Sequence, residues 1–505
     1  MTDNKRIAKN TIMLWIRMLI SIFVSLYTSR IVLNTLGVED YGVYSVVGGI
    51  LSIFSYVKTS TAGAISRFFI YEMGREDTNQ LKITFSSAFM IQLGLALAIV
   101  ILGETIGLWF IENKLVIPEN RLFAAHVVYQ FSIISTAIGF IMVPYDATII
   151  AHERMDLYAY MELLNVTLKL VIVYLLMILT FDKLILYSVL LFIVSCLITL
   201  IYQIYTYRHY QETHIQWKWN FNIVKSMLTF SGWDMYNHTA VSVRTQGFNF
   251  LQNIFFGAKV NAAIGIATTI QGTLLGLAYN VITAFRPPII KCYASDNNKE
   301  MLDLISFCLK ISLAILLVLS LPLFAEIEYI LTLWLGIVPE YTVEFMRLII
   351  IGNVFGMINS IIIIPIHASG NINQMAFWTG TLYLASLIPT YLLFKNDYSP
   401  LSAYYIYLAT MILILIMDYF ILKYKTKING IGDILLKNIL FNTSIASCIW
   451  YILLLIQKNI NTSFMRLLIC CVLSAMLYSF FFYFIMLNTQ QRLSLQAKFK
   501  SIINK

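Results

Sequence analysis

The sequence predicts an all-α polytopic membrane protein. Of its 505 residues, 59% are hydrophobic and only 12% are charged, and the mean hydropathy is +0.76. These values lie well outside the usual range for a soluble domain. Apolar segments of about 20 residues, long enough to cross the hydrocarbon core as a helix, recur along the whole chain. The longest polar connection between them spans about 18 residues, which excludes a soluble domain.

Fourteen segments meet this criterion, with boundaries good to a few residues. They are residues 10–35, 42–66, 83–111, 121–150, 157–180, 184–207, 226–255, 260–285, 302–325, 346–367, 373–394, 401–422, 434–456 and 464–487. The first follows a basic start (Lys5, Arg6, Lys9) and has no A-x-A cleavage site after it. It is therefore expected to be a retained span rather than a signal peptide.

The distribution of basic residues predicts the topology. With the N-terminus inside, the internal segments hold 21 of the 35 Lys and Arg residues, the external loops hold 7, and 7 lie within spans. Cytoplasmic loops carry the excess of Lys and Arg in membrane proteins. Both termini are thus expected in the cytoplasm.

The chain repeats itself in the same direction at an offset near 220 residues. Gly37, a span and Arg67 have counterparts in Gly257, a span and Arg286, and residues 151–160 align with 368–377 at an offset of 217. This predicts two parallel-repeat six-helix lobes, residues 1–210 and 211–425. Residues 426–505 add two C-terminal helices and a tail, which either pack outside the core or form part of a groove for a lipid tail. Repeats of this kind place a site between lobes near the membrane midplane.

Several cations lie inside predicted spans. Arg17 and Arg30 lie in the first span, Lys58 in the second and Arg244 in the seventh. A cation at mid-bilayer is costly, so such residues usually face a protein interior or a wet cavity. We expect these four to line a cationic cavity for phosphate or pyrophosphate, a role that suits the donor fork of arginine. The alternative is that Arg30 and Lys58 snorkel to headgroups and that Arg17 pairs with a carbonyl or carboxylate.

The seventh span also carries a polar stripe. Its members recur at helical spacing and share one face: His238, Ser242, Gln246, Asn249 and Asn253. Such a face must meet water, substrate or another helix. We expect it to line the cavity, where amides and hydroxyls suit a sugar, with interhelical hydrogen bonding as the alternative.

Few acidic residues lie within spans, and they are candidates for ion coupling. Asp146 in the fourth span and Asp234 in the seventh are the two we favour. A carboxylate that titrates as a cavity opens could carry H+ or Na+. Charge neutralisation of nearby cations is the competing interpretation.

The sequence shows no catalytic motif. It has no GxxxxGK[ST] loop, HExxH motif or Ser/His/Asp arrangement, and its six cysteines form no CxxC pair. We therefore expect no enzyme activity, no metal site and no cofactor.

Short segments resemble one known family, the polysaccharide-transporter branch of the MATE-like multidrug, oligosaccharidyl-lipid and polysaccharide superfamily. They are Arg30–Gly37, Tyr41–Tyr44, Ser66–Phe69, Val143–Tyr145 with Ala151–Met155, and Arg286–Pro288. The resemblance implies a flippase for O-antigen or capsule repeat units. Such a protein moves a polyprenyl-pyrophosphate-linked oligosaccharide to the outer leaflet by ion-driven alternating access, working with a polysaccharide polymerase and other assembly proteins.

Three competitors remain open. A peptidoglycan-precursor flippase would also want a cationic cavity. A MATE-type exporter of cationic drugs should have an acidic and aromatic cavity, whereas the intramembrane balance here is basic. A membrane-bound glycosyltransferase or polymerase usually exposes a large catalytic loop, which this chain lacks.

Overall fold

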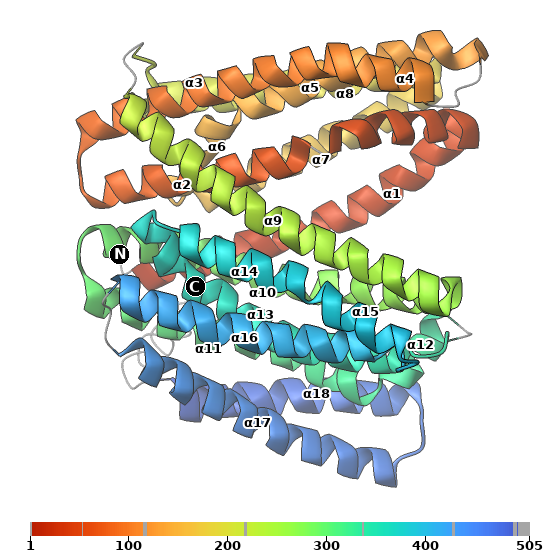
Figure 1. The fold of residues 1–505 in the computed structure, drawn as a ribbon, viewed down its shortest axis with the longest axis vertical. Coiled ribbons are helices and arrows are strands. Elements are labelled where there is room, and N and C mark those ends of the chain that lie inside the picture. The colour runs from red at the N-terminus through yellow and green to blue at the C-terminus, as the bar shows by residue number, and fades with distance from the viewer. Residues whose placement is uncertain are drawn as a thin grey trace, which may run out of the picture. The chain divides into compact units, whose positions relative to one another are not determined.

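The computed structural model describes residues 3–52, 54–114, 119–216, 220–335, 338–426, 430–487 and 492. Within these ranges every regular element is a helix (Figure 1). The predicted all-α class is confirmed for this part of the chain.

The first half of the chain forms long helices joined by short turns. They are α1 (Asp3–Ser52), α2 (Phe54–Gly74), α3 (Thr78–Leu102), α4 (Leu108–Lys114), α5 (Leu122–Ile141), α6 (Val143–Ala151), α7 (Met155–Ile178), α8 (Lys183–His209) and α9 (Phe221–Phe256), with short helical turns η1 (Gly103–Gly107), η2 (Glu119–Arg121) and η3 (Gln211–Thr213).

The second half continues in the same way. Its helices are α10 (Ala258–Ala294), α11 (Asn298–Ala325), α12 (Ile327–Leu335), α13 (Thr342–Ser369), α14 (Asn373–Ala385), α15 (Leu387–Lys395), α16 (Ser402–Thr426), α17 (Ile431–Asn459) and α18 (Phe464–Phe481), which ends in the short turn η4 (Phe482–Met486).

Each predicted span falls on helical residues. Helix α1 contains the first predicted span and the start of the second, separated by a kink at Gly37, and α2 contains most of the second. Among the described residues, ten helical segments are long and apolar enough to cross a membrane. The chain is therefore a multi-pass membrane protein, and the count of fourteen spans stays a prediction.

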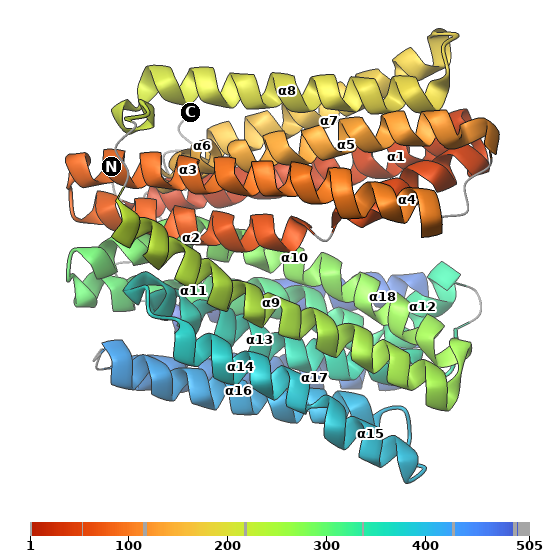
Figure 2. The same ribbon diagram turned by 45° about the horizontal axis from the view of Figure 1, so that its top comes forward.

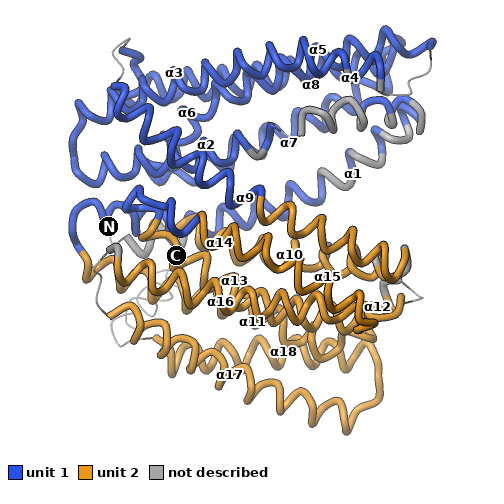
Figure 3. The backbone as a smooth tube through the Cα atoms, in the orientation of Figure 1, with its two compact units in different colours: residues 1–239, 286–297, 367–376 blue, residues 240–285, 298–366, 377–505 orange. Residues whose placement is uncertain are grey.

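The chain divides into two compact units (Figure 3). Unit 1 contains residues 1–239, 286–297 and 367–376, and unit 2 contains residues 240–285, 298–366 and 377–505. Unit 1 therefore includes the C-terminal ends of α10 and α13, and both helices continue into unit 2. The predicted lobes, which end at residues 210 and 425, were defined by the sequence repeat. The two units are defined by which residues pack together, so their boundaries differ from those of the lobes.

The backbone repeats at the offsets seen in the sequence. Gly37 and Gly257 have φ of +80° and +79°, and Glu76 and Asp296 have φ of +58° and +54°. Each pair is 220 residues apart. The third pair, Glu153 (φ +57°) and Gly370 (φ +76°), is 217 residues apart. Left-handed residues are uncommon outside glycine, so three matched pairs indicate two copies of one helix-and-turn pattern.

Unit 1 is built around α1 and α7, which pack along each other, and around α5 packed on α8 and α3 (Figures 1 and 2). Its core includes Val128, Tyr129 and Ile133 of α5 and Leu184 of α8, all fully buried. These buried side chains help fix the spacing of α1, α2, α5, α7 and α8, the helices that line the cavities described below.

Arg67 of α2 ties a distant segment into unit 1. It is buried and donates from Nε to the carbonyl of His367 (3.1 Å) and from Nη2 to the carbonyl of Ala368, both at the end of α13. A helix end leaves such carbonyls without intrahelical partners, so the guanidinium satisfies them. Gly370 follows, and a Cβ there would lie 2.7 Å from Arg67 Nη2. Close approach and a positive φ both require glycine at this position.

Glu153 binds a second distant segment. Its buried carboxylate accepts from Lys291 Nζ (2.8 Å) near the end of α10, and its carbonyl accepts from Asn10 of α1 (3.0 Å). The ends of α10 and α13 are thus held in unit 1 by ionic and hydrogen-bond contacts.

In unit 2, α11 packs against α17 and α18, so the two C-terminal helices are part of this unit (Figure 3). Ile449 and Leu453 of α17, Cys470 and Tyr478 of α18 and Leu317 and Leu321 of α11 form their shared core. Whether these helices lie outside the transport core or form part of a groove for a lipid tail stays a prediction.

Gly257→Ala is expected to lower the midpoint of thermal unfolding of the purified protein. Open space surrounds the new methyl group, but φ is +79°, where a Cβ costs about 1–2 kcal/mol. Gly232→Ala is the matched control, because Gly232 is equally uncrowded and lies in the right-handed region inside α9. It should leave the midpoint unchanged or raise it. Equal effects of the two variants would contradict the conformational account.

Candidate functional site

Unit 1 contains two cavities that share part of their lining. The first, about 550 Å³, lies between α1 and α7 and is lined by Arg17, Ser21, Thr28, Glu162 and Lys169 among others. The second, about 500 Å³, is enclosed by residues of α1, α2, α5, α7 and α8 and also includes Glu162 and Lys169. The two cavities therefore form one polar region inside the helices of unit 1.

Hydroxyl groups from two helices cover the second cavity. They are Ser132, Ser135 and Thr136 of α5, and Ser188, Ser195, Thr199 and Tyr202 of α8. Spacings of three, four and seven residues put each set on one side of its helix. A lipid-facing hydroxyl gains nothing in hydrocarbon, so these helices turn their polar side toward the cavity.

Lys58 enters this cavity from α2. Lys58 is exposed, and its Nζ lies 3.1 Å from where a Cβ on Gly139 would stand. Glycine at position 139 of α5 therefore leaves room for the ammonium group. Lys58 therefore lines a cavity, and its role in binding a substrate stays a prediction.

Arg17 lines the first cavity from α1. Its guanidinium lies over the ring of Tyr158, 5.1 Å from the centroid, and its buried Nε has no hydrogen-bond partner. The Arg17 side chain also hydrogen-bonds to Tyr158, so the unpartnered group is the Nε alone. The side chain of Arg30, the other cation predicted in this helix, lies outside the described residues.

Two carboxylates accompany these cations. Glu162 lines both cavities, and Asp146 of α6 interacts electrostatically with Lys58, Glu162 and Arg17. One oxygen of Asp146 is buried without a hydrogen-bond partner. Among the described residues, the lining of the two cavities and Asp146 together carry three basic groups (Arg17, Lys58 and Lys169) and two acidic ones (Asp146 and Glu162).

Arg244 lies in unit 2, in α9, surrounded by aromatic rings. Its guanidinium is 4.7 Å from the ring centroid of Tyr407, 5.3 Å from that of Tyr383 and 5.4 Å from that of Phe248. It also donates to Thr245 Oγ1 (3.3 Å), while its buried Nε has no hydrogen-bond partner. Cation–π contacts are the means by which this charge is tolerated among apolar helices.

Asp234 and His238 lie one turn apart on α9 and belong to unit 1. The Asp234 carboxylate is buried and 3.5 Å from His238 Nε2, and it interacts electrostatically with His367 and Arg286. Arg286 in turn donates to His367 Nδ1 (3.1 Å). Asp234 is therefore part of a network of charged and polar groups near the ends of α10 and α13, separate from the cavity lining.

The remaining residues of the polar stripe lie on the part of α9 that belongs to unit 2. Gln246 and Asn253 are exposed and Ser242 and Asn249 are partly buried. The two cavities of unit 1 are lined by none of them. Their assignment to a cavity stays a prediction.

The sequence analysis did not select the hydroxyl residues of α5 and α8 or assign Lys169 to the site. A signal for them exists, since Ser188, Ser195 and Thr199 follow helical spacing within a strongly apolar span. Their convergence on one cavity depends on the packing of α5 against α8, which no local pattern shows.

In the part of the chain that the structure describes, no group of three or more His, Cys, Asp or Glu residues could hold a metal ion. The six cysteines are all free thiols.

Comparison with known proteins identifies the fold. A crystal structure of MATE in the bent conformation matches with a TM-score of 0.71 at 11% identity, covering 85% of this chain and 96% of that one. An outward-facing multidrug resistance MATE transporter of the MOP superfamily matches with a TM-score of 0.66 at 13% identity, with the same coverage. The chain has the MATE transporter fold.

A third match has a different character. It is a MOP superfamily transporter from Pyrococcus furiosus, described by the reverse polarity of its binding pocket and a suggested different function. Its TM-score is 0.64 at 14% identity, covering 85% of this chain and 96% of that one. No protein-family model and no curated protein matches the sequence. At these identities the MATE fold is shared, and the cargo has to be argued from the residues.

Asp146→Asn is expected to destabilise the purified protein more than Lys58→Gln does. Removing the Asp146 charge leaves three cations facing one acid, whereas removing the Lys58 charge balances the region. Unbalanced charge in a low-dielectric site costs about 1 kcal/mol or more. Thermal unfolding midpoints measure both effects, with Glu119→Gln on the exposed turn η2 as a control. The opposite order of the two midpoints would contradict an excess of positive charge.

Proposed function

We propose that this protein is a flippase for a polyprenyl-pyrophosphate-linked oligosaccharide repeat unit in surface polysaccharide biosynthesis. Arg17, Lys58 and Lys169 bind the pyrophosphate, and the hydroxyls of α5 and α8 contact the sugar or its water shell. The observation that carries this proposal is the excess of basic groups in a hydroxyl-lined cavity of a transporter fold.

A pyrophosphate accounts for these cations better than structural pairing does. Arg17 has an unpartnered Nε beside the cavity, and Lys58 extends an ammonium group into the other part of it. Phosphate oxygens accept several charge-assisted hydrogen bonds at once, and arginine offers them in a fork. Such groups are retained at a site despite the cost of burying their charge.

The same balance argues against export of cationic drugs. A cationic cargo would meet Arg17, Lys58 and Lys169 and would have only Glu162 and Asp146 to neutralise it. The Pyrococcus furiosus relative of reversed pocket polarity indicates that this fold accommodates more than one pocket charge. A peptidoglycan lipid-precursor flippase remains the alternative, because its cargo presents the same pyrophosphate.

Ion coupling is assigned to Asp146, with Asp234 as a second candidate. Asp146 lies among the cations that the cargo would engage, so cargo binding and protonation would influence each other through charge. Asp234 pairs with His238 instead. In this proposal H+ or Na+ drives alternating access in the bacterial inner membrane. Both termini are cytoplasmic, and a polysaccharide polymerase acts on the product.

Binding of farnesyl diphosphate, a soluble prenyl pyrophosphate, tests the site directly. Isothermal titration calorimetry of the purified protein should show binding of farnesyl diphosphate. The affinity should fall about tenfold or more in the Arg17→Gln, Lys58→Gln double variant, because two charge-assisted contacts are lost. Arg75→Gln is the control, since Arg75 is an exposed cation in the turn after α2. Unchanged binding by the double variant would overturn the assignment, and so would an equal loss in the control.

A further inference from the structure

A separate polar pocket lies in unit 2, where the ends of five helices meet. It has a volume of about 390 Å³ and is lined by residues that include Glu326, Glu328, Arg347, Trp450, Gln457 and Arg466. These come from the end of α11 and start of α12, the start of α13, the end of α17 and the start of α18. The basic-residue distribution predicts that this end of the helices faces the cell exterior. No residue proposed to bind the cargo lines it, so it is independent of the proposed function.

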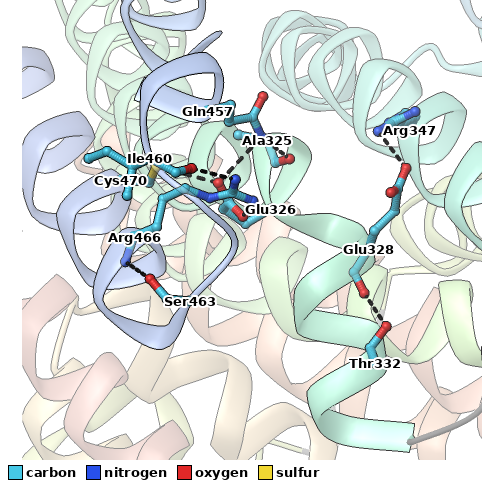
Figure 4. A network of polar contacts seen from close by, with 10 residues as sticks. All are labelled: Ala325, Glu326, Glu328, Thr332, Arg347, Gln457, Ile460, Ser463, Arg466 and Cys470. Atoms are coloured by element: carbon cyan, nitrogen blue, oxygen red, sulfur yellow. Dashed lines mark hydrogen bonds and ion pairs between the residues drawn. The ribbon is translucent and has the colours of Figure 1, made fainter. Parts of the chain in front are cut away.

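The floor of the pocket is fixed and electrically neutral. Glu326 stands between α11 and α12 with a fully buried carboxylate, which accepts from Arg466 Nη2 (2.6 Å) and from Gln457 Nε2 (3.3 Å) (Figure 4). Arg466 also donates to the carbonyl of Ile460 (3.0 Å), and Gln457 donates to that of Ala325 (2.6 Å). A buried ion pair supported by further hydrogen bonds holds its geometry. This network fastens α17 and α18 to α11 and orients Arg466.

The rim of the pocket carries a loosely held cation. Arg347 approaches Glu328 at 3.5 Å, longer than a charge-assisted hydrogen bond of about 2.7–2.9 Å, and Glu328 is 74% exposed (Figure 4). The Arg347 guanidinium lies 5.8 Å from the ring centroid of Phe324, and the buried Arg347 Nε has no hydrogen-bond partner among the described residues. Arg466 is only 9% exposed, and its Nε is likewise buried without a hydrogen-bond partner among the described residues. Two guanidinium groups therefore line one pocket, and Arg347 is the more weakly held of the two.

The walls are apolar. Trp450 packs edge-to-face on Phe324 with ring centroids 5.0 Å apart, and Leu454 and Tyr329 are close by in the lining. Tryptophan and tyrosine at the ends of membrane helices are typical of the headgroup region, where one side of the ring is apolar and the other wet. The volume corresponds to roughly a dozen water molecules, enough for a phospholipid headgroup.

The charge pattern selects the chemistry of the ligand. The weakly held guanidinium of Arg347 calls for a phosphate, and Glu328, once Arg347 turns away from it, calls for a cation a few atoms away. A free metal ion or cationic drug fits poorly, because each carboxylate already faces an arginine. A phosphate linked through two carbons to an ammonium group satisfies both charges at once.

We propose that this pocket binds the phosphoethanolamine headgroup of a membrane phospholipid. Arg347 swings from Glu328 to the phosphate, with Arg466 beside it, and Glu328 receives the ammonium group. The glycerol and first acyl carbons lie along Trp450 and Leu454. A bound lipid then bridges α11, α13 and α17 at the membrane surface.

Native mass spectrometry of the full-length protein in detergent, titrated with phosphatidylethanolamine or phosphatidylglycerol, tests this site. The wild-type protein should bind phosphatidylethanolamine more tightly. Arg347→Gln should weaken binding of both lipids about tenfold, and Glu328→Gln should remove the preference between them. Arg154→Gln is the matched control, because it breaks another Arg–carboxylate pair, Arg154–Asp156 at 3.0 Å, and should bind like the wild type.

Three results would overturn the proposal. They are wild-type affinity in Arg347→Gln, an equal loss in Arg154→Gln, and displacement of the lipid by millimolar inorganic phosphate, which would indicate a site for soluble phosphate. Should Arg347→Gln fail to fold, Glu328→Gln decides the matter, because that exposed side chain contributes little to folding. A retained preference for phosphatidylethanolamine in that variant contradicts the proposed headgroup contact.

Discussion

The structure depends on one constraint, the cost of a polar group that faces hydrocarbon. Charged and hydroxyl-bearing side chains in spans have to turn toward protein or water, and this determines how each helix is rotated in its unit. Helix α8 turns Ser188, Ser195 and Thr199 toward the cavity, and α2 does the same with Lys58. In unit 2, the Arg244 guanidinium lies against three aromatic faces.

The same constraint produces ionic contacts at helix ends. Arg67 satisfies the last carbonyls of α13, Lys291 pairs with Glu153, and Arg466 pairs with Glu326. Each joins residues more than a hundred positions apart, so each fixes a connection that hydrophobic packing alone would leave free to slide. In lipid, where apolar surfaces are all alike, such contacts supply the specificity of helix pairing.

Local patterns in the sequence predicted the helices, and long-range packing decided the site. Each predicted span was visible as an apolar run. The repeat was visible because two equivalent backbone positions with positive φ have kept glycine, at Gly37 and Gly257. Arg17 and Lys58 were recognisable because a charge within an apolar run is conspicuous. The residues around them could not be recognised in the sequence, because Asp146 and Lys169 come close to them only through the packing of α6 and α7 in unit 1. Glu326 lies at the end of a predicted span, and no sequence pattern marked it. Its partner Arg466 reaches it only through the packing of α18.

Transport in vesicles distinguishes an anionic from a cationic cargo for the polar cavities of unit 1. Purified protein is reconstituted with a fluorescent polyprenyl-pyrophosphate oligosaccharide or a cationic dye, under an imposed proton or sodium gradient. If the excess of basic groups in these cavities selects the cargo, the pyrophosphate lipid changes leaflet, Lys58→Gln slows this movement, and the dye is not moved. Transport of the dye, with the lipid left in its original leaflet, would show that the basic groups do not select the cargo.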